Sequence, residues 1–105
     1  MTFEITDSNI DTFLHEDKPL VIDFGAEWCG PCRTLAPIVE GLASEYKGRI
    51  NVGTCDAEEN NALATRYAIR NVPTLLFFRS GELVARCVGM VTVEDLREKF
   101  NALMQ

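Results

Sequence analysis

The stretch of sequence that decides the fold is LVIDFGAEWCGPC, residues 20–32. Its first half, Leu20 to Gly25, is an apolar run broken only by Asp23, which is typical of a strand buried in the middle of a sheet. Its second half carries two cysteines in a C-x-x-C motif, with a proline before the second cysteine. Proline at that point suits the first turn of a helix. The stretch therefore predicts a central strand that leads into a helix, with both cysteines at the junction.

Three further runs have the composition of strands, and they fall at Ile50–Cys55, Thr74–Phe78 and Leu83–Val88. The last two flank Arg79–Glu82, which resembles a hairpin turn and predicts an antiparallel pair. The strands at Leu20–Gly25 and Ile50–Cys55 are instead separated by a helical pattern, and such a crossover makes its two strands parallel. The sheet is therefore expected to be mixed.

Helices are predicted where apolar residues recur every three or four positions. The main helix face consists of Leu35, Ile38, Val39, Leu42 and Tyr46, and this helix should end near Gly48. Other helices are expected at Ile10–Leu14, at Ala62–Tyr67 and at Val93–Leu103, the last opened by Thr92-x-x-Asp95, which resembles a capping box. The core order is βαβαββα, an α/β fold with a mixed sheet.

The net charge of −6 comes from ten Lys and Arg against sixteen Asp and Glu. It repels both nucleic acid and an anionic membrane surface, so neither is expected as a partner. No apolar run approaches the length needed to span a bilayer, and the N-terminus has no secretory signal. We therefore expect one cytoplasmic domain that covers residues 1–105.

The position of the cysteine pair favours chemistry over packing, because reaction sites in open α/β sheets lie at the ends of the strands. A helix start presents unpaired N–H groups and the positive end of the dipole, which stabilise a thiolate. Cys29 is therefore the predicted nucleophile. Pro31 fits the first helical turn, Gly30 allows a tight turn, and the spacing places Cys32 within bonding reach of Cys29.

Thiol–disulfide exchange follows from this arrangement. The Cys29 thiolate would attack a substrate disulfide, and Cys32 would then attack the mixed disulfide, release reduced substrate and leave the pair oxidised. The alternative interpretation of C-x-x-C is half of a zinc site, which needs a second close pair of ligands. Cys55, Cys87 and His15 are far apart in the sequence, so no metal site is predicted.

The motif Trp28-Cys29-Gly30-Pro31-Cys32 resembles the active-site signature of thioredoxins, and the likeness covers essentially the whole chain. Asp23 matches their buried aspartate, Pro37 the site of their helix kink, Val72-Pro73-Thr74 their cis-proline loop, and Val88-Gly89 the glycine of their substrate groove. The resemblance implies the thioredoxin fold. In it a five-stranded sheet of order 1-3-2-4-5 is flanked by four helices, and an N-terminal β-α extension precedes the βαβαββα core.

The resemblance also implies an activity, that of a general protein-disulfide reductase. Such a protein binds no cofactor and is recharged by a thioredoxin reductase, a flavoprotein that uses NADPH. Its partners would be that reductase and disulfide-containing client proteins, and it would act as a monomer. Two other functions stay open at this point: an oxidant or isomerase outside the cytoplasm, and a non-catalytic binding subunit. The Gly-Pro dipeptide between the cysteines is similar to that of the reducing members.

Asp23 is the predicted proton acceptor. Its neighbours Val21, Ile22 and Phe24 favour burial over an exposed strand position, and burial raises the pKa of a carboxyl group. The resemblance implies that Asp23 takes the proton of Cys32 when the mixed disulfide is resolved.

The resemblance further predicts a cis peptide between Val72 and Pro73, packed against the cysteine pair, with the N–H and C=O of Val72 free to pair with an extended substrate. Trp28 is expected to be partly exposed beside the nucleophile rather than part of the core. An apolar patch for binding polypeptide is expected around the sulfurs, made of Gly25, Gly30, Pro31, Val72, Pro73, Gly89 and Met90.

Three positions depart from the commonest thioredoxin pattern, namely Gly25, Arg33 and Thr54. Thr54 falls where many thioredoxins have a buried lysine near the aspartate. Without that ammonium group, Asp23 should stay protonated to higher pH. Of the other cysteines, Cys55 is expected to be buried and inert, whereas Cys87 is expected to be partly exposed on an edge strand.

Overall fold

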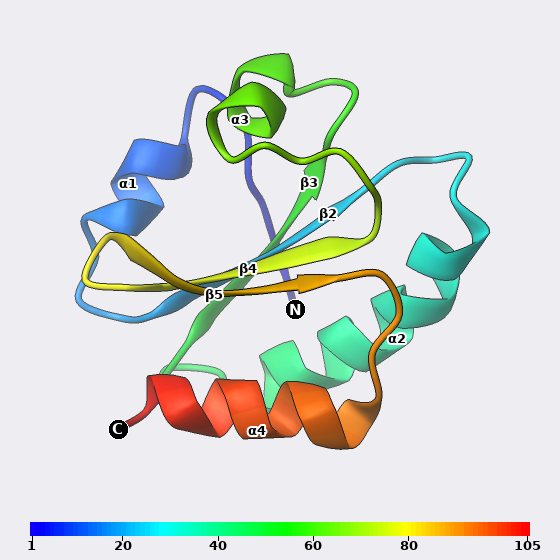
Figure 1. The fold of residues 1–105 in the computed structure, drawn as a ribbon. Coiled ribbons are helices and arrows are strands. Elements are labelled where there is room, and N and C mark those ends of the chain that lie inside the picture. Colours follow the sequence, from blue (N-terminus) through cyan, green and yellow to red (C-terminus); the bar gives the residue numbers. More distant parts are fainter.

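The computed structural model describes residues 1–105 and has a five-stranded sheet with helices on both faces (Figure 1). The elements in chain order are β1 (Phe3–Glu4), α1 (Ile10–Leu14), β2 (Leu20–Gly25), α2 (Gly30–Glu45), β3 (Asn51–Asp56), α3 (Asn61–Arg66), β4 (Thr74–Arg79), β5 (Glu82–Val88) and α4 (Val93–Leu103). The sheet order is β1-β3-β2-β4-β5. The predicted fold, its mixed sheet and its four helices are confirmed.

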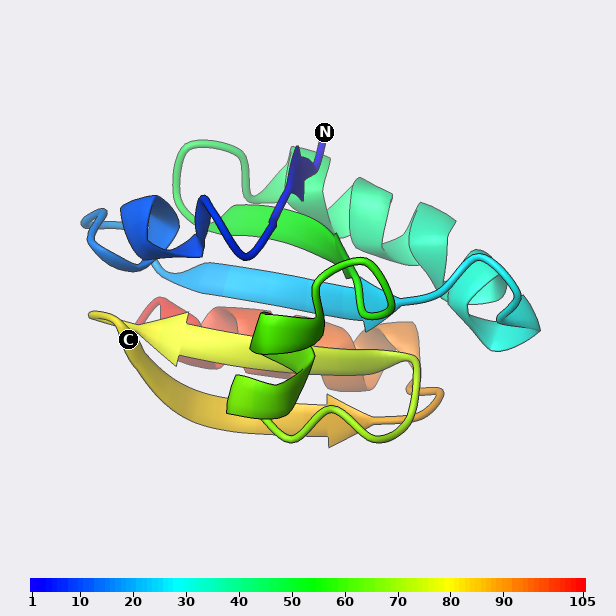
Figure 2. The same cartoon turned by 90° about the horizontal axis from the view of Figure 1, so that it is seen from above.

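Strand β2 lies in the centre of the sheet, between β3 and β4 (Figure 2). It pairs in parallel with β3, where Asp23 lies opposite Thr54, and antiparallel with β4, where Asp23 lies opposite Leu75. All its residues except Gly25 are buried. A strand covered on both faces needs a continuous apolar run, which is the pattern that the sequence shows.

Alternate residues of β2 point to opposite faces of the sheet, and each face has its own apolar cluster. Ile22 and Phe24 pack on the face covered by α1 and α3, whereas Val21 packs on the face covered by α2 and α4 (Figure 1). Asp23 shares the face of Val21 by this alternation. Its carboxyl group is therefore directed to the side of the sheet on which α2, and with it Cys32, lies.

The turns and caps have the expected chemistry. In the hairpin between β4 and β5, Ser80 and Gly81 have φ values of 54° and 79°, the positive values that two-residue hairpin turns require. The Oγ1 atom of Thr92 accepts a hydrogen bond from the N–H of Asp95 at 3.0 Å and so caps α4. Helix α2 continues through Pro37 and ends at Glu45, slightly earlier than predicted.

Cys87 corrects one expectation from the sequence. It lies on the edge strand β5 as predicted, but only 7% of it is exposed, because it faces α4 and packs in the same cluster as Leu75 and Leu96. Burial raises the pKa of its thiol. Cys55 is buried as predicted, and burial raises the pKa of that thiol to about 12. Both thiols are therefore protonated at neutral pH and unreactive.

Gly53 allows β1 to pack against β3. A Cβ atom at this position would lie 2.8 Å from Cδ1 of Ile5 and 3.1 Å from the carbonyl oxygen of Phe3. We expect Gly53→Ala to lower the free energy of unfolding by about 1–3 kcal/mol, because the added methyl group overpacks this contact. Denaturant titration would measure the loss.

Gly41→Ala is the matched control, since a Cβ atom there meets nothing within 4 Å on an exposed face of α2. It should raise the free energy of unfolding by about 0.5–1 kcal/mol through helix propensity. If Gly53→Ala were as stable as the unsubstituted protein, the close packing of β1 on β3 would be wrong.

Candidate active site

Cys29 occupies the N-cap of α2, immediately after the loop that leaves β2. Its Sγ atom accepts a hydrogen bond from the backbone N–H of Cys32 at 3.2 Å. A disulfide joins the two cysteines, whose Cα atoms lie 5.3 Å apart. Only 3% of Cys29 and 9% of Cys32 are exposed, whereas Gly30 and Pro31 between them are exposed. The two cysteines therefore do not differ much in exposure. They differ in position, because only Cys29 lies at the N-cap, where the start of the helix favours a thiolate.

The Val72–Pro73 loop lies against this sulfur. The peptide between these residues is cis, as predicted, and the carbonyl oxygen of Val72 lies 3.7 Å from Sγ of Cys29. Neither the N–H nor the C=O of Val72 takes part in a hydrogen bond between backbone groups. Gly89, with a φ of 84°, donates its N–H to the carbonyl oxygen of Pro73 at 2.8 Å. The fold thus brings Gly89 next to the loop that touches the disulfide.

Asp23 is buried, with 6% of its surface exposed, and no group of the protein donates a hydrogen bond to its Oδ1 atom. Burial alone raises the pKa of this carboxyl group to about 6. Asp23, Cys32 and Thr54 line the same hollow, whose volume is about 270 Å³. The predicted burial of Asp23 is confirmed, and the structure brings it together with the second cysteine of the motif.

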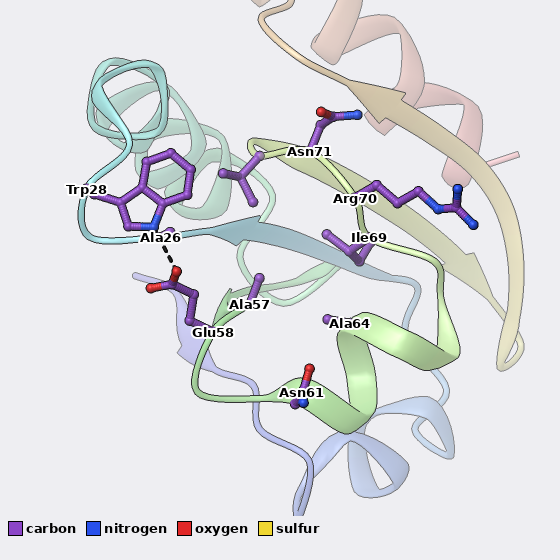
Figure 3. Close-up of a pocket in the computed structure, with 10 residues that line it drawn as sticks. Ala26, Trp28, Ala57, Glu58, Asn61, Ala64, Ile69, Arg70 and Asn71 are labelled. Carbon is purple, nitrogen blue, oxygen red and sulfur yellow. Dashed lines mark hydrogen bonds between the residues drawn. The ribbon is translucent and has the colours of Figure 1, made fainter.

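Trp28 is 65% exposed, which confirms that it is not part of the core. Its Nε1 atom donates a hydrogen bond to Oε2 of Glu58 at 2.9 Å (Figure 3). Beside it lies a groove of about 560 Å³. Val72 contributes to this groove, and most of its other lining residues were not found from the sequence, namely Ala57, Glu58, Asn61, Ala64, Ile69, Arg70 and Asn71 (Figure 3).

A signal for part of this groove existed in the sequence. Strand β3 runs parallel to β2, and loops that follow parallel strands gather at one edge of the sheet. Ala57 and Glu58 directly follow the end of β3, and this position predicts that they lie near the loop that carries Trp28. Arg70 and Asn71 come from the loop between α3 and β4, for which the sequence has no comparable signal.

The described residues show no group of three or more His, Cys, Asp or Glu side chains placed to hold a metal ion. No helix combines the length and the apolar character that crossing a membrane requires.

A cysteine pair at a helix N-cap, next to a cis-proline loop and a buried carboxyl group, defines a thiol–disulfide oxidoreductase. Comparison with known proteins agrees, since residues 1–102 match the family model of thioredoxin. The chain belongs to the thioredoxin family, whose members are protein-disulfide reductases, and it carries the redox-active pair of that family.

Several curated relatives are similar over most of this chain. Thioredoxin 1 of Nostoc sp. is 43% identical over 96 residues, which are 90% of each chain. The thioredoxin of Acidithiobacillus ferridurans is 43% identical over 93 residues, 88% of this chain and 86% of the relative. The chloroplastic M-type thioredoxin of Spinacia oleracea is 41% identical over 101 residues, 92% of this chain and 56% of the relative.

The buried carboxyl group of Asp23 should cost stability. Its pKa in the folded protein is about 6 against an ordinary value of 3.8, so the ionised form is disfavoured by folding. The cost is absent below pH 3.8, grows as the pH rises to about 6 and is then constant. Two pKa units correspond to about 3 kcal/mol, so Asp23→Asn should stabilise the protein by up to that amount at pH 8.

Denaturant titrations of both proteins at pH 4 and pH 8 would measure this effect. The stability difference should nearly vanish at pH 4, where the carboxyl group of Asp23 is mostly protonated. A difference of the same size at both pH values would show that the carboxyl group is not desolvated.

Thr54, opposite Asp23 on β3, provides a second test. Thr54→Lys would place an ammonium group beside the carboxyl group and should lower the pKa of Asp23 from about 6. Thr54→Val, which has nearly the same shape but adds no positive charge, should not lower it. Carbon-13 NMR of the Asp23 carboxyl group would measure its pKa in both variants. Equal apparent pKa values in the unsubstituted and Thr54→Lys proteins would refute the effect of this position.

Proposed function

We propose that this chain is a general reductant of protein disulfides in which Cys29 attacks and Cys32 resolves. The observation that supports these roles is the hydrogen bond from the N–H of Cys32 to Sγ of Cys29 at the N-cap of α2. In the reduced protein the same N–H and the helix dipole favour a thiolate on Cys29. Cys32 lies inside the first turn of α2, so its sulfur does not cap the helix.

The reaction then has two steps. In the first, the Cys29 thiolate attacks one sulfur of a client disulfide, a bond forms between the two chains, and the second client sulfur leaves as a thiolate. In the second, Asp23 accepts the proton of Cys32, and the new thiolate attacks Sγ of Cys29. The client leaves reduced, and Cys29 and Cys32 are joined. A pKa of about 6 leaves Asp23 mostly ionised at pH 7 and able to accept this proton.

The client docks across the surface around Cys29. The free N–H and C=O of Val72 can pair with an extended client segment, which is a form of strand addition. Around the sulfur Trp28, Gly30 and Pro31 are exposed, Val72 and Gly89 are partly exposed, and Pro73 is buried beneath them. We assign substrate binding to Trp28, Gly30, Pro31, Val72, Pro73 and Gly89, and we extend this surface along the groove of Figure 3.

The wider cycle is also a proposal. A flavoprotein thioredoxin reductase with electrons from NADPH would reduce the Cys29–Cys32 disulfide again, and the chain itself would bind no cofactor. The Gly-Pro dipeptide between the cysteines supports a reducing role rather than an oxidising one. We propose a monomer that works in the cytoplasm. The relative from spinach is named as chloroplastic, so the compartment does not follow from the family.

Reduction of insulin disulfides in the presence of NADPH and a thioredoxin reductase tests this function. The unsubstituted protein should turn over, Cys29→Ser should fall to the background rate, and Cys32→Ser should stop at a mixed disulfide with insulin that mass spectrometry detects. Cys87→Ala is the matched control, because that thiol is buried away from the site, and it should keep the activity.

Two results would count against the proposal. Absence of turnover by the unsubstituted protein would exclude a general reductase. A cellular role that survives Cys29→Ser would instead indicate a non-catalytic binding subunit.

A further inference from the structure

The hollow beside Asp23 is separate from the substrate groove, and the two share only Ala26 among the residues that line them. Its volume is about 270 Å³. The residues around it come from β2, β3, α2 and the loop before α2. Trp28 and the cis-proline loop do not line this hollow, and the only proposed step that involves it is the proton transfer from Cys32 to Asp23.

The carboxyl group of Asp23 forms no ion pair with a cationic side chain. Asp23 is more than nine-tenths buried, and its Oδ1 atom has no hydrogen-bond donor. The other acids that line the hollow are Glu27 and Asp56, which add negative potential. Arg33 is the only cation among the lining residues, and its Nη1 atom donates to the backbone oxygen of Glu27 at 2.6 Å. The partner of Asp23 on β4 is Leu75, which is apolar.

The walls of the hollow are formed by small residues where larger ones would close it. A Cβ atom at Gly25 would lie 3.4 Å from both Cβ and Sγ of Cys32, so the missing side chain leaves the space in front of Cys32 open. Ala36 and Thr54 are also short, and Thr54 adds a hydroxyl acceptor opposite Asp23. The hollow therefore combines a buried acceptor without a partner, an acidic rim and room for a small group.

We propose that this hollow binds one ammonium or guanidinium group, which pairs with the Asp23 carboxylate and is also held by Thr54 and Asp56. A group with N–H donors matches these acceptors, because charge-assisted hydrogen bonds to a carboxylate are the strong ones. The group can come from a free small amine or from a Lys or Arg side chain of a docked protein, since the hollow reaches Cys32. Binding itself does not depend on the proposed function.

Occupancy would have a consequence for the reaction, and this consequence alone rests on the proposed function. A bound cation favours the ionised form of Asp23, which is the form that can accept the proton of Cys32. Asp23 is already mostly ionised at pH 7, so this effect is expected near and below pH 6, where the carboxyl group is otherwise largely protonated. A docked client that carries a basic residue near its cysteine would then keep Asp23 ionised in this pH range.

The oxidised protein, labelled with carbon-13 at aspartate carboxyl groups, tests the binding without any turnover. Methylammonium chloride should shift the Asp23 signal saturably and lower its titration midpoint. Tetramethylammonium chloride at the same ionic strength, which has no N–H donor, should do neither. The Asp56 signal should respond at the same methylammonium concentration, because the same bound group contacts it.

Variants separate this site from a general salt effect. Thr54→Lys should abolish the response to methylammonium, because its own ammonium group fills the hollow. Thr65→Lys, on an exposed position of α3, adds the same charge elsewhere and should keep the response. Equal responses to both salts, or an unchanged response in Thr54→Lys, would contradict binding in the hollow.

A covalent complex tests whether a Lys or Arg side chain of a docked client supplies the cation. Cys32→Ser can be joined through Cys29 to a peptide with either lysine or norleucine next to its cysteine. A lower Asp23 midpoint with lysine only would identify a client side chain as the occupant, and a response to methylammonium only would identify a free amine. No response in either experiment would overturn the proposal, while insulin reduction would still report on the proposed function separately.

Discussion

The hydrogen bond from the backbone N–H of Cys32 to the sulfur of Cys29 is the contact on which the site depends. It exists because β2 ends close to the start of α2, so that Cys29 falls at the N-cap of a 16-residue helix. A helix N-terminus directs unpaired N–H groups and the positive end of its dipole at the capping atom. Here the capping atom is the sulfur of Cys29. The N–H groups that usually stabilise a helix through its cap here also stabilise a thiolate.

Strand β2 also places a carboxyl group, that of Asp23, in the same hollow as Cys32. Alternation along the strand turns Asp23 to the face of α2, where it shares a hollow with Cys32 and gains no hydrogen-bond donor at Oδ1. Such a group lowers the stability of the folded protein at neutral pH. A destabilising carboxyl group next to a cysteine of the reactive pair is what a site shaped for proton transfer would contain.

Much of this arrangement could be predicted because its signals are local. The apolar run of β2 and the C-x-x-C motif gave the bounds of β2 and the helix start, and the likeness to thioredoxins supplied the sheet order and the cis peptide before Pro73. The face to which Cys87 points depends on the register of an edge strand, and this was predicted wrongly. Arg70 and Asn71 line the groove because the loop after α3 passes beside it, and no local sequence pattern indicates the course of that loop.

The assignment of Cys29 as the attacking thiol can be measured on the reduced protein by limited alkylation with iodoacetamide at pH 7, followed by mass spectrometry of the peptides. Capping of α2 by Cys29 predicts that the label is found at Cys29 well before Cys32, and that Cys55 and Cys87 stay unlabelled while the protein is folded. Equal labelling of the two motif cysteines, or faster labelling of Cys32, would contradict the role given to the helix N-terminus.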